Sequence, residues 1–392
     1  MSVSKGSQRH NSADVHAFAP SLETSSVRGT GVFDALGPTL DDLFEATGAP
    51  IMARRTWLET WISCYPDHEP LAVEVRSLSQ NALVAVALLA TRRRRGILEV
   101  VRMGDGATDY ARFPARNRHA ARSLGSALIS ELAKIRGPWR LFIGQLPPKD
   151  PVAQEVARNL RTSMVGPGDG SPTVRFERGR LLENYVPHKV RANMRTRTNR
   201  MRREGITPVF FRTRESDEIV RILPEADGVR RARDTALARR SKLDDERYLR
   251  FRHTVLRKLA AEGHVELAGL RVAGELIAYQ IGLLDGTVYR QWDSRFHPAW
   301  RQFGPGTLLN SEALGSVLKD PRFTEFDFMR GVHAHKLEYA TDVRSAESLV
   351  AWSSPNVRTI GSLEERLKRI VRGPRRGPGQ PSTPPQSIAG AG

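Results

Sequence analysis

The segment FDFMRGVHAHKLEYA, residues 326–340, gathers side chains that can exchange protons or carry charge. Within thirteen positions it holds Asp327, Arg330, His333, His335, Lys336, Glu338 and Tyr339. A carboxylate or an imidazole can act as a general base, a fixed cation can stabilise an oxyanion, and a phenol can act as an acid. We therefore expect Asp327 or a histidine as the base, Lys336 as the cation and Tyr339 as the acid.

Each of these residues also has a structural alternative. Asp327 lies between Phe326 and Phe328 in a strand-like run, so its side chain points away from them and can equally accept a structural hydrogen bond. His333 and His335 are equally consistent with an ordinary loop. No further ligands cluster around them, so the sequence predicts no metal site.

A second group, RQFGPG at residues 301–306, lies between an expected strand and an expected helix. Glycines let the backbone approach a phosphate, and the free N–H groups and dipole of a helix N-terminus attract it. Arg301 adds an ionic contact, whereas the proline at position 305 has no N–H. The expected donors are therefore Gly304, Gly306 and Thr307. The alternative is a plain break between two elements.

The stretch HKVRANMRTRTNRMRR, residues 188–203, has seven Lys/Arg and no acidic residue. It predicts a helix whose thin apolar stripe consists of Val190, Met194 and Met201. Arg191 and Arg195, four positions apart, share one face and can grip an anionic substrate. The alternative is a solvated face. The helix lacks aromatic residues, which disfavours a stacking platform for single-stranded nucleic acid.

The loop MGDGATDYARF, residues 103–113, is the remaining candidate. Tyr110 can line a substrate cleft between two domains, although a simple turn also explains the glycines.

Composition limits the class of protein. The chain has 392 residues, 40% hydrophobic and 27% charged, with a formal net charge of +18 and one cysteine, Cys64. These values suit a soluble globular protein with anionic ligands and exclude an internal disulfide or a cysteine-rich zinc site. We see no secretory signal or membrane-spanning run, so we expect a cytoplasmic protein.

The elements repeat in order along the chain. In the first half, LAVEV, ALVAVALLA and ILEVVRM read as strands, followed by a helix and the strand RLFIGQL, with PTVRF as a short strand before residue 180. In the second half, HVELAGLRVAGELIAYQIGLLDGTVYRQWD reads as three antiparallel strands, followed by a helix and the strand FTEFDFMRG, with AESLVAW last. A strand–helix–strand crossover places its two strands parallel. We predict an α/β fold of two similar domains, 31–180 and 181–356, with a tail at 1–30 and a basic, then Pro/Gly-rich tail at 357–392.

Three stretches carry a family resemblance. RANMRTRTNRMRREGITPVFF, FGPGTLL and FDFMRGVHAHKLEYA resemble, in order and spacing, elements of the two-domain branch of the GNAT acyltransferases that includes CelD-like acetyltransferases and FemAB peptidyltransferases. The resemblance spans roughly residues 45–355. It departs at His335, where the branch commonly has an aromatic residue before the lysine.

The resemblance implies two tandem GNAT-like domains, each a mixed, mostly antiparallel sheet flanked by helices. It also implies that the loop holds the pyrophosphate of acyl-CoA or acetyl-CoA. The expected coenzyme-binding residues are Arg301, Gln302, Phe303, Gly304, Gly306 and Thr307. Lys336 is implied to act on the transferred acyl group.

The expected function is acyl-CoA-dependent N-acyltransfer to a small or carrier-linked amine. Direct attack by the amine is expected, because Cys64 lies far from the loop in sequence and in an apolar helix. One alternative is a FemAB-like peptidyltransferase that uses aminoacyl-tRNA. The other is a non-catalytic basic binding module, which would not need R-x-x-G-x-G between a strand and a helix.

Overall fold

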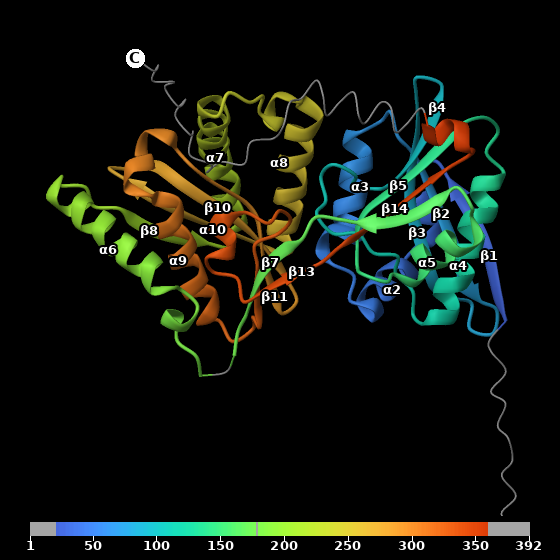
Figure 1. Cartoon of the computed structure of the whole chain (residues 1–392), viewed down its shortest axis with the longest axis horizontal. Helices are drawn as coiled ribbons and strands as arrows, with labels where there is room; N and C mark the ends of the chain where they lie inside the picture. The colour runs from blue at the N-terminus through green and yellow to red at the C-terminus, as the bar shows by residue number, and fades with distance from the viewer. Residues whose placement is uncertain (1–20, 178, 360–392) are drawn as a thin grey trace, which may run out of the picture.

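The computed structural model describes residues 21–177 and 179–359. It forms two halves, each built around one seven-stranded mixed sheet flanked by helices (Figure 1), so the predicted α/β class is confirmed. Most of the two predicted tails lies outside the described residues. Residues 22–28, however, form an edge strand, which we had assigned to a tail. Most of this strand is exposed and most of its residues are polar. Its sequence therefore lacks the alternation of apolar and polar residues that identifies a half-buried strand.

The first sheet has the order β1-β2-β3-β4-β5-β14-β6. Its strands are β1 (Leu22–Arg28), β2 (Glu69–Ser77), β3 (Ala82–Arg94), β4 (Ile97–Arg102), β5 (Trp139–Leu146), β14 (Glu347–Trp352) and β6 (Ser163–Pro167). The helices of this half are α1 (Val32–Leu36), α2 (Thr39–Thr47), α3 (Arg55–Cys64), α4 (Arg118–Ala133) and α5 (Pro151–Asn159).

The second sheet has the order β13-β7-β12-β11-β10-β9-β8. Its strands are β13 (Asp342–Arg344), β7 (Ser171–Arg175), β12 (Glu325–Asp327), β11 (Val288–Phe296), β10 (Glu275–Asp285), β9 (Val265–Val272) and β8 (Val209–Thr213). The helices of this half are α6 (His188–Arg203), α7 (Ser216–Ala236), α8 (Glu246–Ala261), α9 (Pro305–Leu318) and α10 (Ala334–Leu337), with a 3₁₀ helix, η4 (Pro298–Phe303), before α9.

Both predicted crossovers are present. β4 runs parallel to β5 with α4 between them, and β11 runs parallel to β12 with α9 between them. The three preceding strands in each half are antiparallel, as the turn dipeptides and alternating patterns predict. The two halves therefore share one arrangement of three antiparallel strands, a helix and a parallel strand.

The halves exchange one strand each. β14, which the sequence order assigns to the second half, pairs with β5 and β6 of the first sheet, and β7 pairs with β12 and β13 of the second. The apolar pattern of a strand does not specify a distant pairing partner, so the sequence alone missed this exchange. The domain ranges 31–180 and 181–356 stay a prediction, and under them each domain lends a strand to its neighbour.

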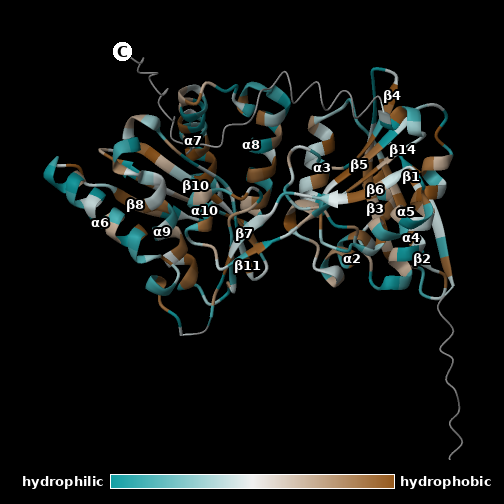
Figure 2. Cartoon of the chain, viewed as in Figure 1, coloured by the Kyte–Doolittle hydropathy of each residue, from teal (hydrophilic) through white to brown (hydrophobic). Residues whose placement is uncertain are grey.

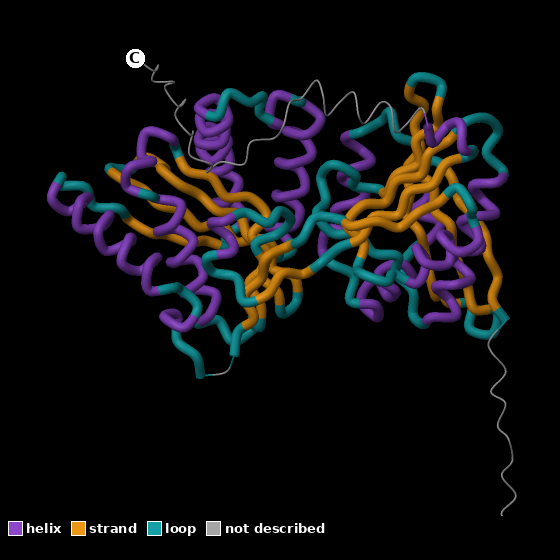
Figure 3. The backbone as a smooth tube through the Cα atoms, in the orientation of Figure 1, coloured by secondary structure: helices purple, strands orange, loops and turns teal. Residues whose placement is uncertain are grey.

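Alternation along the strands gives each sheet two apolar faces. In the second sheet, one face packs on α7 and α8 and the other on α6 and α9. One core continues from α1–α3 of the first half into α7 and α8, where Trp57 lies 5.3 Å from Phe251 and 5.4 Å from Trp292, centroid to centroid. Figure 3 shows helices covering the strands in both halves, and Figure 2 shows that α6 is largely hydrophilic. The shared core holds the two halves together.

Candidate active site

The second crossover opens where its two strands part. β11 and β12 pair over three residues, from Val288–Glu325 to Arg290–Asp327. β12 then ends, while β11 continues to Phe296 and leads through η4 into α9. The carboxyl ends of the two strands and the N-terminus of α9 therefore border one opening.

The predicted loop forms a glycine turn at this N-terminus. Gly304 has φ 59° and ψ 47°, a left-handed conformation that few residues other than glycine adopt, and no side chain caps the helix there. The three expected donors differ. The Gly304 N–H donates to the Arg301 carbonyl at 3.1 Å, and the Thr307 N–H donates to the Gly304 carbonyl at 3.0 Å. The Gly306 N–H lies in the first turn of α9, where a helix leaves its backbone N–H groups without intrahelical acceptors. The Gly304 and Thr307 N–H groups already have partners within the turn.

A basic side chain that we did not predict lies on the turn. A Cβ at Gly304 would overlap the guanidinium of Arg197, from α6. Arg197 lies on the apolar stripe of that helix, between Met194 and Met201, and is the cation on the face that packs toward α9. Its place on the stripe was the sequence signal that could have identified it.

Other arginines surround the same turn. Arg301 is exposed. The pKa of Arg233, from α7, is lowered mainly by the burial of Arg233 and next by the positive charge of Arg301. The Arg233 guanidinium lies 4.3 Å from the ring centroid of Phe296, and a Cβ at Gly306 would meet that same ring. The N-terminus of α9 is therefore a site of concentrated positive charge, suited to an anion.

Two predicted loop residues have structural partners. Phe303 is 3% exposed and packs in the core under α9, with its ring centroid 5.8 Å from that of Trp300. The side-chain oxygen of Gln302 accepts a 3.0 Å hydrogen bond from Arg200 of α6. Phe303 therefore anchors the loop in the core, and Gln302 holds it against α6.

Lys336 lies at α10, on the chain that follows β12. Its Nζ donates to the backbone carbonyls of Met329 at 3.1 Å and Arg330 at 2.9 Å. Met329 has φ 61°, an uncommon conformation for a residue with a side chain, and Gly331 has φ 102°. Burial lowers the pKa of Lys336 to about 8, although the charges of Asp109 and Asp327 oppose the shift.

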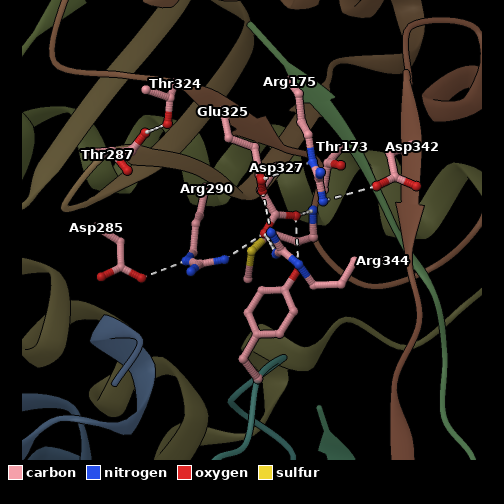
Figure 4. Close-up of polar contacts among 12 residues, drawn as sticks. Thr173, Arg175, Asp285, Thr287, Arg290, Thr324, Glu325, Asp327, Asp342 and Arg344 are labelled. Atoms are coloured by element: carbon pink, nitrogen blue, oxygen red, sulfur yellow. Dashed lines mark hydrogen bonds and ion pairs between the residues drawn. The ribbon is translucent and has the colours of Figure 1, made fainter. Parts of the chain in front are cut away.

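Asp327 lies at the centre of a buried polar network (Figure 4). Its carboxylate has no exposed surface and accepts hydrogen bonds from Tyr110 Oη at 2.7 and 2.9 Å, Arg290 at 2.6 Å, Arg344 at 3.0 Å and the Met329 N–H at 2.7 Å. These partners leave it no surface for a substrate. The geometry fits the structural alternative rather than the general base.

Tyr110 crosses from the first half to reach this network. Its hydroxyl donates to Asp327, and its ring lies 4.7 Å from the Arg290 guanidinium. Burial, with the negative charge of Asp327, raises the pKa of Tyr110. Its position fits an anchor between the halves rather than a lining residue with a free hydroxyl.

Tyr339 connects the motif of residues 326–340 to α9. It is 3% exposed, and its Oη lies 3.2 Å from Ser311 Oγ and donates to the Thr307 carbonyl at 3.4 Å. Burial raises its pKa, so the phenol keeps its proton. Lys336 thus contacts the chain after β12, and Tyr339 contacts α9. His333 and His335 stack on each other at the exposed surface, with centroids 5.7 Å apart.

The remaining predicted residues lie on α6. Arg195 is exposed, and Arg191 is half-buried with its Nε unpartnered. Residues 21–177 and 179–359 contain no group of three or more His, Cys, Asp or Glu side chains that could hold a metal ion. Among the described helices, none combines the length and apolar composition of a membrane span.

Comparisons with known proteins agree with this geometry. Residues 188–337 match the family described as Acetyltransferase (GNAT) domain. The search of curated proteins finds no match. FemX resembles the chain with a TM-score of 0.58 and 10% identity over 83% of this chain and 98% of FemX.

Two further solved structures are similar at lower scores. A conserved protein of unknown function from Bacteroides thetaiotaomicron VPI-5482 has a TM-score of 0.49 and 12% identity over 80% of this chain and 97% of its own. A tandem GNAT protein from the clavulanic acid biosynthesis pathway has a TM-score of 0.44 and 16% identity over 86% and 99%. Residues 188–337 thus match a GNAT acetyltransferase domain, and the chain shares its fold with FemX.

Proposed function

We propose that the protein is an N-acyltransferase that moves an acyl group from acyl-CoA, acetyl-CoA being the simplest donor, to an amine. The observation that carries this proposal is the N-terminus of α9, where a left-handed glycine turn, the Gly306 N–H and the guanidinium of Arg197 converge beside the parting of β11 and β12. A phosphate suits this N-terminus because the missing side chain lets the Arg197 guanidinium lie against the turn, where the helix dipole and the first N–H groups also attract an anion.

In this account the second half holds the coenzyme. The pyrophosphate accepts a hydrogen bond from the Gly306 N–H and lies at the positive end of the α9 dipole. Arg197 and Arg301 balance its negative charge. The pantetheine arm then runs along the opening between β11 and β12 toward Lys336. This direction follows from the glycine turn and α10 bordering the same opening.

The chemistry is direct transfer. The neutral amine nitrogen attacks the thioester carbonyl carbon, the C–N bond forms and the C–S bond breaks. The nitrogen loses one proton to solvent, and the released thiolate takes one from Tyr339, which regains a proton from solvent. Lys336 stabilises the oxyanion, and Tyr339 supplies a proton toward the leaving group, as the motif predicts. A covalent intermediate on Cys64 is disfavoured because that thiol is 2% exposed within α3.

One observation favours a second donor, aminoacyl-tRNA. Helix α6 carries exposed arginines beyond the one on the turn, among them Arg195, Arg202 and Arg203, and they extend the positive surface away from α9. An extended cationic helix suits a polyanion larger than a coenzyme.

Native mass spectrometry of the purified full chain tests the donor. We expect a bound species with the mass of coenzyme A, or one that appears on adding it, and release of free thiol when acetyl-CoA and amines are supplied. Retention of tRNA without coenzyme A binding would favour the second donor and contradict the first.

A further inference from the structure

A polar pocket of about 410 Å³ lies between the two halves, away from the α9 turn. Its lining comes from the end of β4 and the loop after it, from β5, β6 and β14, and from Arg330 of the second half. This volume is in the range of small-molecule sites. The place corresponds to the opening of the first crossover, because β4 ends at Arg102 while β5 continues to Leu146.

Arg102 is an unusual side chain to find in this wall. It is 9% exposed, and no described carboxylate lies within ion-pair distance of it. Two of its nitrogens donate to the backbone carbonyls of Tyr110 at 3.0 Å and Thr108 at 3.3 Å, and its Nε has no partner. Burial lowers its pKa to about 10. The charges of Asp105 and Asp109 oppose this shift without forming an ion pair with Arg102. The unpartnered Nε of this buried guanidinium is therefore available to an anion in the pocket.

Gln145 supplies an unpartnered acceptor in the same pocket. It is 7% exposed, and its side-chain Oε1 has no hydrogen-bond donor. Its backbone φ of 62° lies in the left-handed region, which is uncommon for glutamine. A Cβ at Gly168 would lie 2.8 Å from that oxygen and 3.1 Å from the Cβ of Ala346, so only glycine lets the backbone pass this close to Gln145.

The charges that line the pocket have both signs. Arg102 and Arg330 provide positive charge, and Asp105 and Asp169 provide negative charge. Arg330 approaches Asp169 only to 3.7 Å, too far for a hydrogen bond, so this pair has room to accept a ligand. A ligand that complements such a wall carries a carboxylate and an amine together.

Arg330 also connects the pocket to the proposed reaction centre. Its backbone carbonyl accepts the 2.9 Å hydrogen bond from Lys336 Nζ, and its Nε lies 3.6 Å from Asp109, whose charge acts on Lys336. Arg330 therefore lines the pocket and also binds Lys336, the lysine that we place at the acyl group.

We propose that this pocket binds the acceptor, and that the acceptor is a small amine bearing a carboxylate, an amino acid or a close analogue. The carboxylate pairs with Arg102, and hydroxyl, amide or ammonium hydrogens of the ligand donate to Gln145 Oε1 and to Asp169. The assignment of the ligand as the acceptor rests on the proposed acyl transfer; the pocket and its ligand class rest on the lining residues alone.

The test measures the binding of matched amines to the full chain in the absence of coenzyme. Saturation-transfer NMR and calorimetry detect this binding. The pairs are L-lysine with cadaverine, L-ornithine with putrescine and β-alanine with ethylamine, which differ by the carboxylate. We expect the carboxylated member to bind at least about tenfold more tightly, because a charge-assisted hydrogen bond is lost without it. Equal binding of both members, or no binding of any carboxylated amine at millimolar concentration, would overturn the proposal.

Variants locate the binding. Arg102→Gln should remove the preference for the carboxylate, whereas Arg118→Gln, which removes the same charge from the exposed start of α4, should leave it unchanged. Because Arg102 also holds two loop carbonyls, Asp169→Asn serves as a second variant: this side chain is 69% exposed, and its loss should weaken the amines several-fold in a folded protein. Unchanged affinity in Asp169→Asn and in a folded Arg102→Gln would contradict the site.

Coenzyme A titration of the same variants separates this inference from the proposed function. Coenzyme A binding that persists while no carboxylated amine binds would overturn the pocket and leave the donor site standing. Carboxylated amines that bind through Arg102, in a protein that binds no coenzyme A, would support the pocket and remove the acyl-CoA donor.

Discussion

The two halves share a crossover and differ at the helix that it contains. In the first half, the Asn117 side chain accepts a 2.8 Å hydrogen bond from the Ala120 N–H and caps α4. In the second, the glycine turn at Gly304 leaves α9 without a side-chain cap, and Arg197 lies against it. A capped helix N-terminus has lost part of its capacity for an anion, whereas an uncapped one with arginines retains it.

The openings beside these two helices are also lined by different residues. The first contains the polar pocket around Arg102 and Gln145, and the second borders Lys336 and Tyr339. One arrangement of strands thus supplies two kinds of site. We infer a division of labour in which the second half holds the acyl donor and the first half contributes to the acceptor.

The largest expected effect is at the glycine turn. Gly304→Glu introduces a side chain where Arg197 lies and a negative charge where the phosphate binds, and it strains a left-handed residue. We expect coenzyme A binding to become undetectable by calorimetry. Thermal unfolding of the variant is the control, since a folded protein with unchanged coenzyme affinity would remove the donor site from α9.

Lys336→Ala should lower turnover on the order of a hundredfold, because a positioned cation facing an oxyanion is worth roughly 3 kcal/mol. The coenzyme dissociation constant should change little. Steady-state kinetics at saturating acetyl-CoA measure the first quantity and calorimetry the second. If the variant instead loses coenzyme affinity and keeps its saturated rate, Lys336 is a binding residue.

The dependence of turnover on pH should reflect the ionisation of Lys336. Its pKa of about 8 means that the ammonium is present below that pH and is lost as the pH rises through it. Turnover that depends on the cation should therefore fall above about pH 8. Lys336→Arg, whose guanidinium stays charged to higher pH, should move the fall upward; an unmoved profile would assign it to another group.

Arg197→Gln should weaken coenzyme A by about tenfold, the value of one charge-assisted contact to a phosphate. Arg195→Gln, an exposed arginine on the same helix, is the matched control and should change coenzyme affinity little. The difference should shrink with added salt, because exposed contacts are screened over about 10 Å at 0.1 M salt. Equal effects of the two substitutions would mean that α6 acts only through its overall charge.

The sequence-based prediction that Arg191 and Arg195 grip an anionic acceptor competes with the acceptor pocket around Arg102, and the same kinetic series separates the two. An increase in acceptor KM in the double variant Arg191→Gln/Arg195→Gln, with coenzyme binding intact, would support it.

The smallest effect is expected at Asn117. Asn117→Ala removes the cap of α4 and should lower the free energy of unfolding by about 1 kcal/mol. It should leave coenzyme A affinity unchanged, since we place the donor site in the second half. Chemical denaturation measures the stability, and a gain or loss of coenzyme binding would break the comparison between the halves.

Sequence reasoning reached the elements more easily than their pairing. The alternation in residues 265–296 and the glycine before α9 identify strands and a helix from local signals. The exchange of β7 and β14 between sheets depends on contacts between distant segments, which no local pattern encodes. The same limit explains β1, a polar edge strand whose pairing is made entirely with β2.

The candidate site shows the same limit at single residues. The motif places Asp327 near Lys336, but only the packing shows that Tyr110, Arg290 and Arg344 bury its carboxylate. Arg102 gave no sequence signal, because an arginine at the end of a strand is ordinary until its burial and its unpartnered Nε are known.

A crystal structure of the full chain with coenzyme A tests the central claim most directly. The account predicts the pyrophosphate at the N-terminus of α9, receiving the Gly306 N–H and the Arg197 guanidinium, with the thiol directed toward Lys336. Coenzyme bound at the N-terminus of α4, or in the pocket around Arg102, would contradict the assignment of donor and acceptor to the two halves.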